Sequence, residues 1–291
     1  MSKTYLILDA NYLARRALYS MGNLTHGDVK TGMIYGFFKD VQNLQDRFGT
    51  NHVIFCFDYG KGIRKEMFPD YKVKRHKKER SPEEELVEEA FHLQIDRLRE
   101  KYLPYIGYKN IFYQWGYEGD DIVASITQDL PDEDEAIMVT ADEDLFQLIK
   151  PNVTFYNPNK QKMYTIQSFK KEYGIEADQW WKVKALGGCK TDEVPSVAKG
   201  VGEGTAIKYI RGALPKHYKA YHDIRTPLAI ANRKRNIPLV KLPLSNVNRF
   251  VLQTDTLTDK KWNKFCDRLG FKSMRNKAVK RKKRNLGVVN D

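Results

Sequence analysis

Four short runs of hydrophobic residues, each followed closely by a carboxylate, organise the first half of the chain. The runs cover residues 5–8, 53–57, 111–113 and 136–139. Their apolar residues are continuous rather than alternating, which is typical of strands in a parallel sheet with both faces buried. Helix-like segments at residues 11–20 and 32–48, the latter with apolar residues at helical spacing, separate the first two runs. This order predicts an α/β fold with a mainly parallel central sheet flanked by helices.

A helix start is predicted at residues 81–84, between the second and third hydrophobic runs. In Ser81-Pro82-Glu83-Glu84, the serine is an N-cap, the proline stands at the first helical position and Glu84 closes a capping box. We expect this helix to extend to about residue 102. The other expected elements are a short helix at 145–149, a hairpin at 153–155 and 163–165, helices at 166–173 and 178–186, and several helices between 212 and 271, the last packing through Trp262, Phe265 and Leu269.

The carboxylates at and near the ends of the four runs are the first candidate for chemistry. In an open parallel sheet the carboxyl ends of the strands share one edge, where ligands bind. Carboxylates gathered there repel one another unless a cation compensates them, and Mg²⁺ prefers such oxygen ligands. Each acid could instead only cap the helix that follows it, but so many at once favour a metal site. The acids are Asp9, Asp58, Glu118, Asp120, Asp121, Asp142 and Asp144.

The balance of charge points to a polyanionic partner. The formal net charge is +13 and the pI is about 9.4, which could serve solubility alone but also suits nucleic acid. Residues 60–80 hold nine basic and three acidic residues, interleaved with Phe68, Tyr71 and His76. Basic and aromatic residues together suit a phosphate backbone with bases to stack; the alternative is a solvated face. Residues 272–284 carry eight basic residues and no acid, as a disordered or nucleic-acid-contacting tail would.

Closely spaced glycines at residues 187–206 give a second candidate for nucleic-acid binding. Gly200-Val201-Gly202 precedes an expected helix, so its backbone N–H groups could approach a phosphate. A tight turn without function is the alternative. Following a helix that ends near residue 186, the segment resembles a helix-hairpin-helix, which holds the DNA backbone without reading its sequence.

Three cysteines without paired spacing, Cys56, Cys189 and Cys266, argue against a disulfide framework or a zinc site. The first residues lack an apolar signal region, and no apolar run approaches the length that spans a membrane. We therefore expect a cytoplasmic protein with no membrane partner.

The ordered set of motifs resembles the flap endonuclease/5′→3′ exonuclease family, especially its stand-alone bacteriophage members, over roughly residues 3–250. The resemblance implies a PIN-like metal-dependent nuclease domain at residues 1–185 with a basic arch at about 60–100. It further implies a helix-three-turn-helix and C-terminal helical DNA-binding region at 186–270, and a basic tail at 271–291. The motifs that carry it are Asp9, Asp58, Tyr71-Lys72 with Arg75, Glu118-x-Asp120-Asp121, Asp142-x-Asp144, Asp192 and Gly200-Val201-Gly202.

The resemblance also implies a division of labour between these residues, around two Mg²⁺ or Mn²⁺ ions. Lys72 and Arg75, at the foot of the arch, would contact the scissile phosphate. A K⁺ ion is an optional ligand of the helix-three-turn-helix. The first metal would have Asp9, Asp58, Glu118 and Asp120, and the second Asp142, Asp144 and Asp192, with Asp120 between them and Asp121 close by. The implied DNA contacts are Arg16, Tyr71, Lys199, Gly200, Gly202 and Thr205.

Cys189 departs from the family pattern, since bacteriophage relatives usually carry an aspartate three residues before the position of Asp192. A hard cation gains little from a protonated thiol, so we expect weaker binding of the second metal.

The activity implied by the resemblance is that of a structure-specific 5′ nuclease, both flap endonuclease and 5′→3′ exonuclease. It would hydrolyse DNA phosphodiesters by a two-metal mechanism in replication or repair. The protein would act as a monomer on DNA with 5′ flaps or ends, in the host cytoplasm if it is encoded by a phage. Two alternatives stay open: removal of RNA primers from RNA–DNA hybrids, and structure-specific DNA binding without catalysis.

Overall fold

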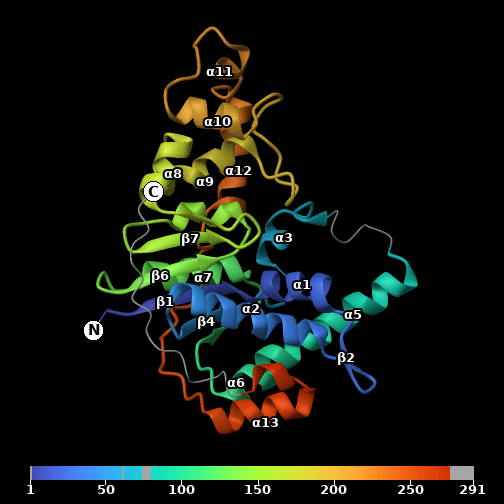
Figure 1. Ribbon diagram of the computed structural model, residues 1–291. Helices are drawn as coiled ribbons and strands as arrows, with labels where there is room; N and C mark the ends of the chain where they lie inside the picture. The colour runs from blue at the N-terminus through green and yellow to red at the C-terminus, as the bar shows by residue number, and fades with distance from the viewer. Residues whose placement is uncertain (1, 61, 74–79, 276–291) are drawn as a thin grey trace.

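The protein is described by a computed structural model over residues 2–60, 62–73 and 80–275. Its centre is a six-stranded sheet with the order β5-β4-β1-β6-β7-β8, in which every neighbouring pair is parallel except the last (Figure 1). The predicted α/β fold with a mainly parallel sheet is therefore confirmed, and the expected hairpin is the pair β7–β8. The strands are β1 (Thr4–Asp9), β4 (His52–Cys56), β5 (Ile111–Phe112), β6 (Glu135–Val139), β7 (Val153–Asn157) and β8 (Lys162–Tyr164).

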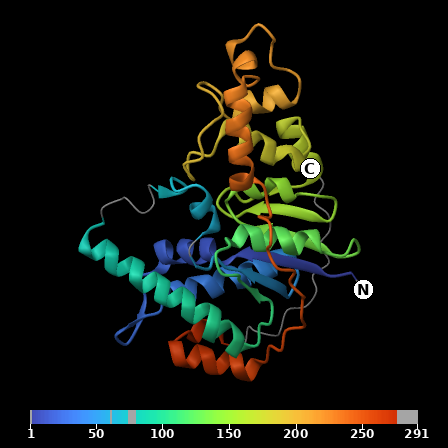
Figure 2. The same ribbon diagram turned by 180° about the vertical axis from the view of Figure 1, so that it is seen from behind.

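Both faces of the sheet are covered by helices, which explains the continuous apolar runs. Tyr5 and Ile7 of β1 pack into one hydrophobic cluster together with Ile122 of α7 (Gly119–Gln128). Leu6 and Leu8 point to the other face, where they join the buried residues of α1 (Ala10–Met21) and α2 (Gly32–Phe48). Figures 1 and 2, seen from opposite sides, place α1 and α2 on one face and α7 on the other.

The predicted helix start at Ser81 is present with both hydrogen bonds of the capping box. The helix α5 (Pro82–Arg97) begins there and continues through a π-helical turn, η1 (Leu98–Tyr102), into α6 (Leu103–Ile106). Phe91 and Ile95 of α5 are buried against the core. Before α5 lie a small hairpin of β2 (Thr25–His26) and β3 (Val29–Lys30) and the short helix α3 (Ile63–Met67).

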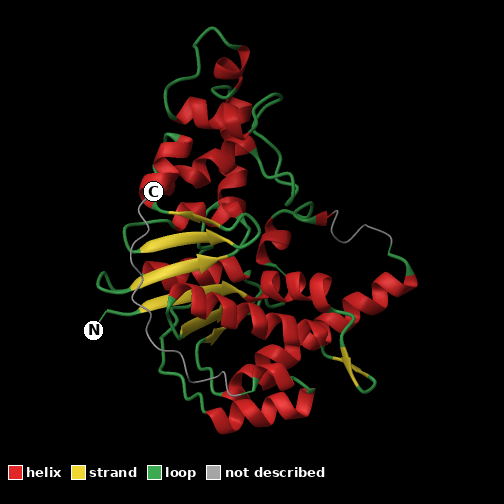
Figure 3. Ribbon diagram, viewed as in Figure 1, coloured by secondary structure: helices red, strands yellow, loops and turns green. Residues whose placement is uncertain are grey.

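A helical region stands at the β8 edge of the sheet (Figure 3). The expected helices at 166–173 and 178–186 are α8 and the pair η3–α9, and the short helix at 145–149 is the 3₁₀ helix η2. The ring of Phe146 in η2 contacts Phe155 of β7 and Trp180 of α9, which joins this region to the sheet. Its elements are η2 (Glu143–Leu148), α8 (Ile166–Tyr173), η3 (Ala177–Gln179), α9 (Trp180–Gly187), α10 (Glu203–Ile210), α11 (Lys219–Asp223) and α12 (Pro227–Val240).

The last helices, α13 (Asp259–Leu269) and η4 (Lys272–Met274), do not lie with α10–α12. The chain returns along the sheet domain, and α13 packs beneath it at the opposite end of the molecule (Figure 1). Trp262 and Phe265 are buried there against Phe38 of α2. Residues 259–269 therefore pack against the hydrophobic core of the sheet domain.

Among the described residues, no helix is both long enough and apolar enough to cross a bilayer.

Candidate metal and nucleic-acid site

The carboxyl ends of β1, β4 and β6 and the start of α7 open on one cleft with a volume of about 1470 Å³. Acids separated by more than 130 positions in the sequence line it together, because parallel strands end at the same edge of the sheet. The lining acids of the predicted set are Asp9, Asp58, Glu118, Asp120, Asp142 and Asp144. Asp192 lies beside them, with its carboxylate within 4.8 Å of a carboxylate oxygen of Asp144.

Several of these acids also cap a helix, so the two interpretations of the sequence, a metal site and helix capping, do not exclude each other. Asp9 is the N-cap of α1: one carboxylate oxygen accepts from the N–H of Tyr12 at 2.9 Å and the other from the hydroxyl of Thr140 at 3.1 Å. Asp142 caps η2 by accepting from the N–H of Asp144 at 2.9 Å. A carboxylate has about four lone pairs, so these bonds leave room for a cation.

Two other acids, Asp58 and Glu118, lie where the end of β4 meets the start of α7. Asp58, after β4, accepts a hydrogen bond from the backbone N–H of Gly119 at 2.7 Å. Glu118 does not end a strand, because β5 stops at Phe112; it stands at the N-cap of α7.

The clustered acids hold protons more tightly than isolated ones. Burial, and next the charge of Asp58, raise the pKa of Asp9 to about 7. Burial, and next the charge of Asp144, raise the pKa of Asp142 to about 6. The pKa of Asp120 is raised well above its ordinary value by burial and by the charges of Asp142 and Asp9. A proton or a cation must neutralise such a group, and oxygen donors of this kind fit a hard divalent ion.

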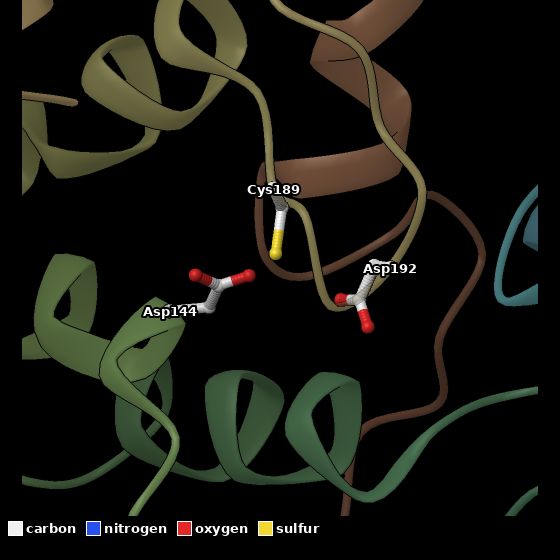
Figure 4. A group of neighbouring side chains, drawn as sticks. All are labelled: Asp144, Cys189 and Asp192. Atoms are coloured by element: carbon white, nitrogen blue, oxygen red, sulfur yellow. The ribbon is translucent and has the colours of Figure 1, made fainter. Parts of the chain in front are cut away.

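Cys189 lies between two of the acids (Figure 4). Its sulfur and carboxylate oxygens of Asp144 and Asp192 are all within 4.8 Å of one another. The loop is fixed by paired backbone hydrogen bonds between Cys189 and Val194, each 2.9 Å long. Burial and the two neighbouring carboxylates raise the pKa of the thiol to about 11, so without metal it is protonated at neutral pH. The three donors fit a divalent ion in position, but the thiol is a poorer partner for Mg²⁺ than an aspartate would be.

Lys72 and Tyr71, both predicted to contact DNA, contact Glu118 in this structure. The Lys72 ammonium pairs with one oxygen of Glu118 and lies 3.9 Å from the carboxylate of Asp192. Burial alone would raise the pKa of Glu118, but the charges of Lys72 and Arg64 outweigh it and lower that pKa. Tyr71 is buried, and its hydroxyl donates to the other oxygen of Glu118 at 3.0 Å. Its side chain therefore lines the cleft with little surface exposed to solvent. Arg75 lies outside the described residues.

Asp121 differs from the other predicted acids, because an arginine binds both of its carboxylate oxygens. The buried guanidinium of Arg64 donates to both its carboxylate oxygens, at 2.6 and 2.8 Å, and also to Glu118 at 3.2 Å. Asp121 is fully buried and accepts a further bond from the N–H of Leu244 at 2.7 Å. It forms a structural ion pair and does not line the cleft. In the sequence, nothing distinguished Arg64 from the other basic residues of segment 60–80.

Lys184 is a second residue that the sequence did not single out. Its ammonium lies 3.0 Å from Asp144 and 3.3 Å from Glu203, the first residue of α10. It therefore links the acidic cleft to the glycine loop. Its position in a helix that showed no motif gave no signal of this role.

The predicted DNA contacts outside the cleft lie on α1 and at the start of α10. Arg16 of α1 is partly exposed and pairs with Asp40 at 3.4 Å. Lys199, Gly200 and Gly202 are exposed on the loop before α10, and Thr205 stands in its first turn. Gly200 has a φ of +81°, in the left-handed region that favours glycine. This loop thus presents backbone and a lysine to solvent.

In a comparison with known proteins, residues 4–174 match the family described as 5′-3′ exonuclease, N-terminal resolvase-like domain. The chain is 32% identical to the 5′-3′ exonuclease of Bacillus subtilis over 216 residues, covering 71% of this chain and 69% of that protein. It is 30% identical to DNA polymerase I of Mycobacterium leprae over 298 residues, which is 94% of this chain but only 31% of the polymerase. The chain thus spans about a third of such polymerases. These relatives are bacterial, so the bacteriophage-type subgroup stays a prediction.

Solved structures share the fold. A zinc-bound T5 5′-exonuclease superposes with a TM-score of 0.67 at 22% identity, over 83% of this chain and 90% of that one. The catalytic core of Rad2 in complex with DNA substrate superposes with a TM-score of 0.56 at 15% identity, over 93% and 89%. At these identities the likeness establishes the α/β sheet with its helical C-terminal region.

Proposed function

The chain belongs to the 5′-3′ exonuclease family, and we propose that it is a structure-specific 5′ nuclease acting on DNA with 5′ flaps or ends. The observation that carries this proposal is that six acids and the basic Lys72 line one cleft. A cleft that gathers so much negative charge in a protein of net charge +13 suits metal-assisted hydrolysis of a phosphodiester.

The residues that would hold two divalent ions are seven of the eight predicted acids. Asp121 is left out, because Arg64 and Leu244 already occupy its oxygens. The ions, Mg²⁺ or Mn²⁺, would activate water and stabilise the leaving oxygen when bound. The first set is Asp9, Asp58, Glu118 and Asp120, and the second is Asp142, Asp144 and Asp192, beside Cys189.

Lys72 would contact the substrate phosphate. Its ammonium already balances Glu118, and a metal at Glu118 would release it toward a phosphate, where it and Arg75 would stabilise developing negative charge.

Duplex binding is assigned to Arg16 and to the loop with Lys199, Gly200, Gly202 and Thr205, with K⁺ as an optional ligand of that loop. The exposure of the loop and its link to Asp144 through Lys184 support this assignment. So does the existence of a T5 flap endonuclease complex with DNA and metal ions, an enzyme of the same fold. The protein would act as a cytoplasmic monomer in replication or repair, in the manner of a bacteriophage-type nuclease.

Cleavage of a 5′-labelled double-flap DNA with Mg²⁺, with Mn²⁺ and with EDTA tests this proposal. We expect metal-dependent cleavage near the junction. Asp120→Asn should lower the rate at least about 100-fold while duplex binding stays intact. Asp132→Asn is the matched control, since Asp132 is exposed in the turn before β6, at the far end of that strand from the cleft.

The same assay separates the alternatives. Faster cleavage of an RNA-tipped substrate than of its DNA twin would identify a primer-removing nuclease. Metal-independent binding without any cleavage would identify a DNA-binding protein and contradict the proposal.

A further inference from the structure

Three aromatic residues form an exposed platform directly beyond Asp58. Tyr59 lies at its centre: its ring centroid is 5.0 Å from that of Tyr113 and 5.4 Å from that of Trp115, with interplanar angles of 72° and 86°. Trp115 is 66% exposed and Tyr113 39% exposed. We call Tyr59, Tyr113 and Trp115 the aromatic platform. A single exposed hydrophobic residue is ordinary, but aromatic rings that contact one another at the surface form the kind of patch that marks a binding site.

The platform is held firmly by the surrounding backbone. The N–H of Gly116 donates to the carbonyl of Tyr59 at 2.8 Å. A Cβ atom at Gly60, where φ is +82°, would come within 2.8 Å of the Trp115 ring, so only glycine lets the indole lie against the chain there. The side chain of Gln114 is tied on both sides, donating to the carbonyl of Asn246 at 3.1 Å and accepting from the N–H of Asn248 at 2.7 Å. Trp115 is therefore exposed but pre-positioned.

A buried arginine supports the two tyrosines. The guanidinium of Arg99 lies 4.4 Å from the ring centroid of Tyr59 and 4.9 Å from that of Tyr113. Arg99 is 4% exposed, and its Nε–H finds no hydrogen-bond acceptor within the described part of the chain. Its charge is balanced by Asp96 at 2.7 Å and Glu100 at 2.9 Å. Arg99 stands in the π-helical turn η1, a rare form that recurs at functional sites.

The platform continues the acidic cleft. Tyr59 and Gly60 line the same cleft as Asp58 and Glu118, and Tyr59 follows Asp58 directly in the chain. A nucleotide whose phosphate lies at the acids therefore has a neighbouring nucleotide near Tyr59, and the rings of Tyr113 and Trp115 adjoin that of Tyr59 outside the cleft lining. A base in duplex DNA is already paired and stacked, whereas an unpaired base can stack on an aromatic ring whatever its identity.

On the basis of the proposed nuclease function, we propose that the aromatic platform binds an unpaired nucleobase of the strand whose phosphate lies in the cleft. Trp115 supplies the exposed stacking surface, Tyr59 joins it to the cleft, and Arg99 fixes the tyrosines. The platform would thereby favour substrates with a single-stranded 5′ segment over blunt duplexes, without preference for sequence.

Binding of fluorescent 5′-flap DNA to the full chain, measured by anisotropy in EDTA so that no cleavage occurs, tests this proposal. Trp115→Ala should weaken flap binding about 5- to 30-fold, in the lower part of the range for base–aromatic stacking. It should leave blunt-duplex binding unchanged, and Trp115→Phe should retain most of the affinity. Tyr105→Ala is the matched control, because Tyr105 is an exposed aromatic residue on α6.

An abasic scan of the single-stranded segment identifies the stacked base. In the wild-type protein, one abasic position should weaken binding by about the same factor as Trp115→Ala, and that loss should vanish in the variant. 2-Aminopurine at that position should be quenched by the wild type and not by Trp115→Ala.

Two outcomes would overturn the proposal: full flap affinity of Trp115→Ala, or a wild-type protein for which no abasic position matters. The second needs no variant, so a folding defect cannot obscure it. Either outcome with metal-dependent cleavage intact would reject the platform alone, whereas absence of cleavage by the wild type would reject the nuclease function.

Discussion

Replacing Arg64 by methionine should destabilise the protein severely. The Arg64 side chain is 3% exposed and donates four hydrogen bonds: two to Asp121, one to Glu118 and one to the carbonyl of Leu239. Among the described residues, its removal leaves the carboxylate of Asp121, which is 0% exposed, with only the backbone N–H groups of Leu244 and Glu118 as donors. Breaking a buried ion pair by removing one partner costs about 3–5 kcal/mol. For a chain of this size, that corresponds to a melting temperature lower by about 6–20 °C.

Thermal and urea unfolding, followed by circular dichroism, measure this loss. Asp121→Leu alone should destabilise by a similar amount, since it leaves the guanidinium buried without its main partner. The double variant Arg64→Met, Asp121→Leu should be more stable than the sum of the two losses predicts, by about 2 kcal/mol or more, because no buried charge is left unpaired. Lys65→Met, next to Arg64 but exposed, is the control.

Strict additivity of the two losses, or a loss below about 1 kcal/mol for Arg64→Met, would refute this reasoning. The first result would mean that the two side chains do not depend on each other. The second would mean that water reaches Asp121 in solution.

Three further predictions concern the cleft. Because the pKa values of Asp9 and Asp142, about 7 and about 6, are raised above those of an unfolded chain, the metal-free protein should lose stability as the pH rises from about 4 to about 7. Mg²⁺ should therefore raise the melting temperature more at pH 8 than at pH 5, where protons compete; equal increases would contradict this. Cys189→Asp should tighten binding of the second Mn²⁺ ion in calorimetry, whereas Cys189→Ser should not, since a carboxylate suits that ion better than a thiol or hydroxyl; no difference between the two would count against Cys189 as the weak donor. Lys72→Ala should slow single-turnover cleavage about 100-fold, while the exposed Lys101→Ala on η1 should not; an unchanged rate would remove Lys72 from the mechanism.

The sequence by itself determined the sheet and the place of the site. Strand β1 is continuous in apolar residues because its alternate side chains, such as Ile7 and Leu8, enter different hydrophobic clusters. Parallel strands then bring Asp9, Asp58 and Asp142 to one edge, as a matter of topology. The start of α5 at Ser81 was equally predictable, since a capping box is made by residues three positions apart.

Only the tertiary structure decided which charges face the cleft. Asp121 and Arg64 are 57 positions apart, and they can pair only because the fold brings Arg64 of α3 to the first turn of α7. The same holds for Lys184 beside Asp144 and for the burial of Tyr71. Local pattern cannot predict such pairs, because the free energy that selects them comes from desolvation and from partners supplied by distant segments. The aromatic platform beyond Asp58 is of this kind as well: its three residues come from two loops that meet only in the folded chain.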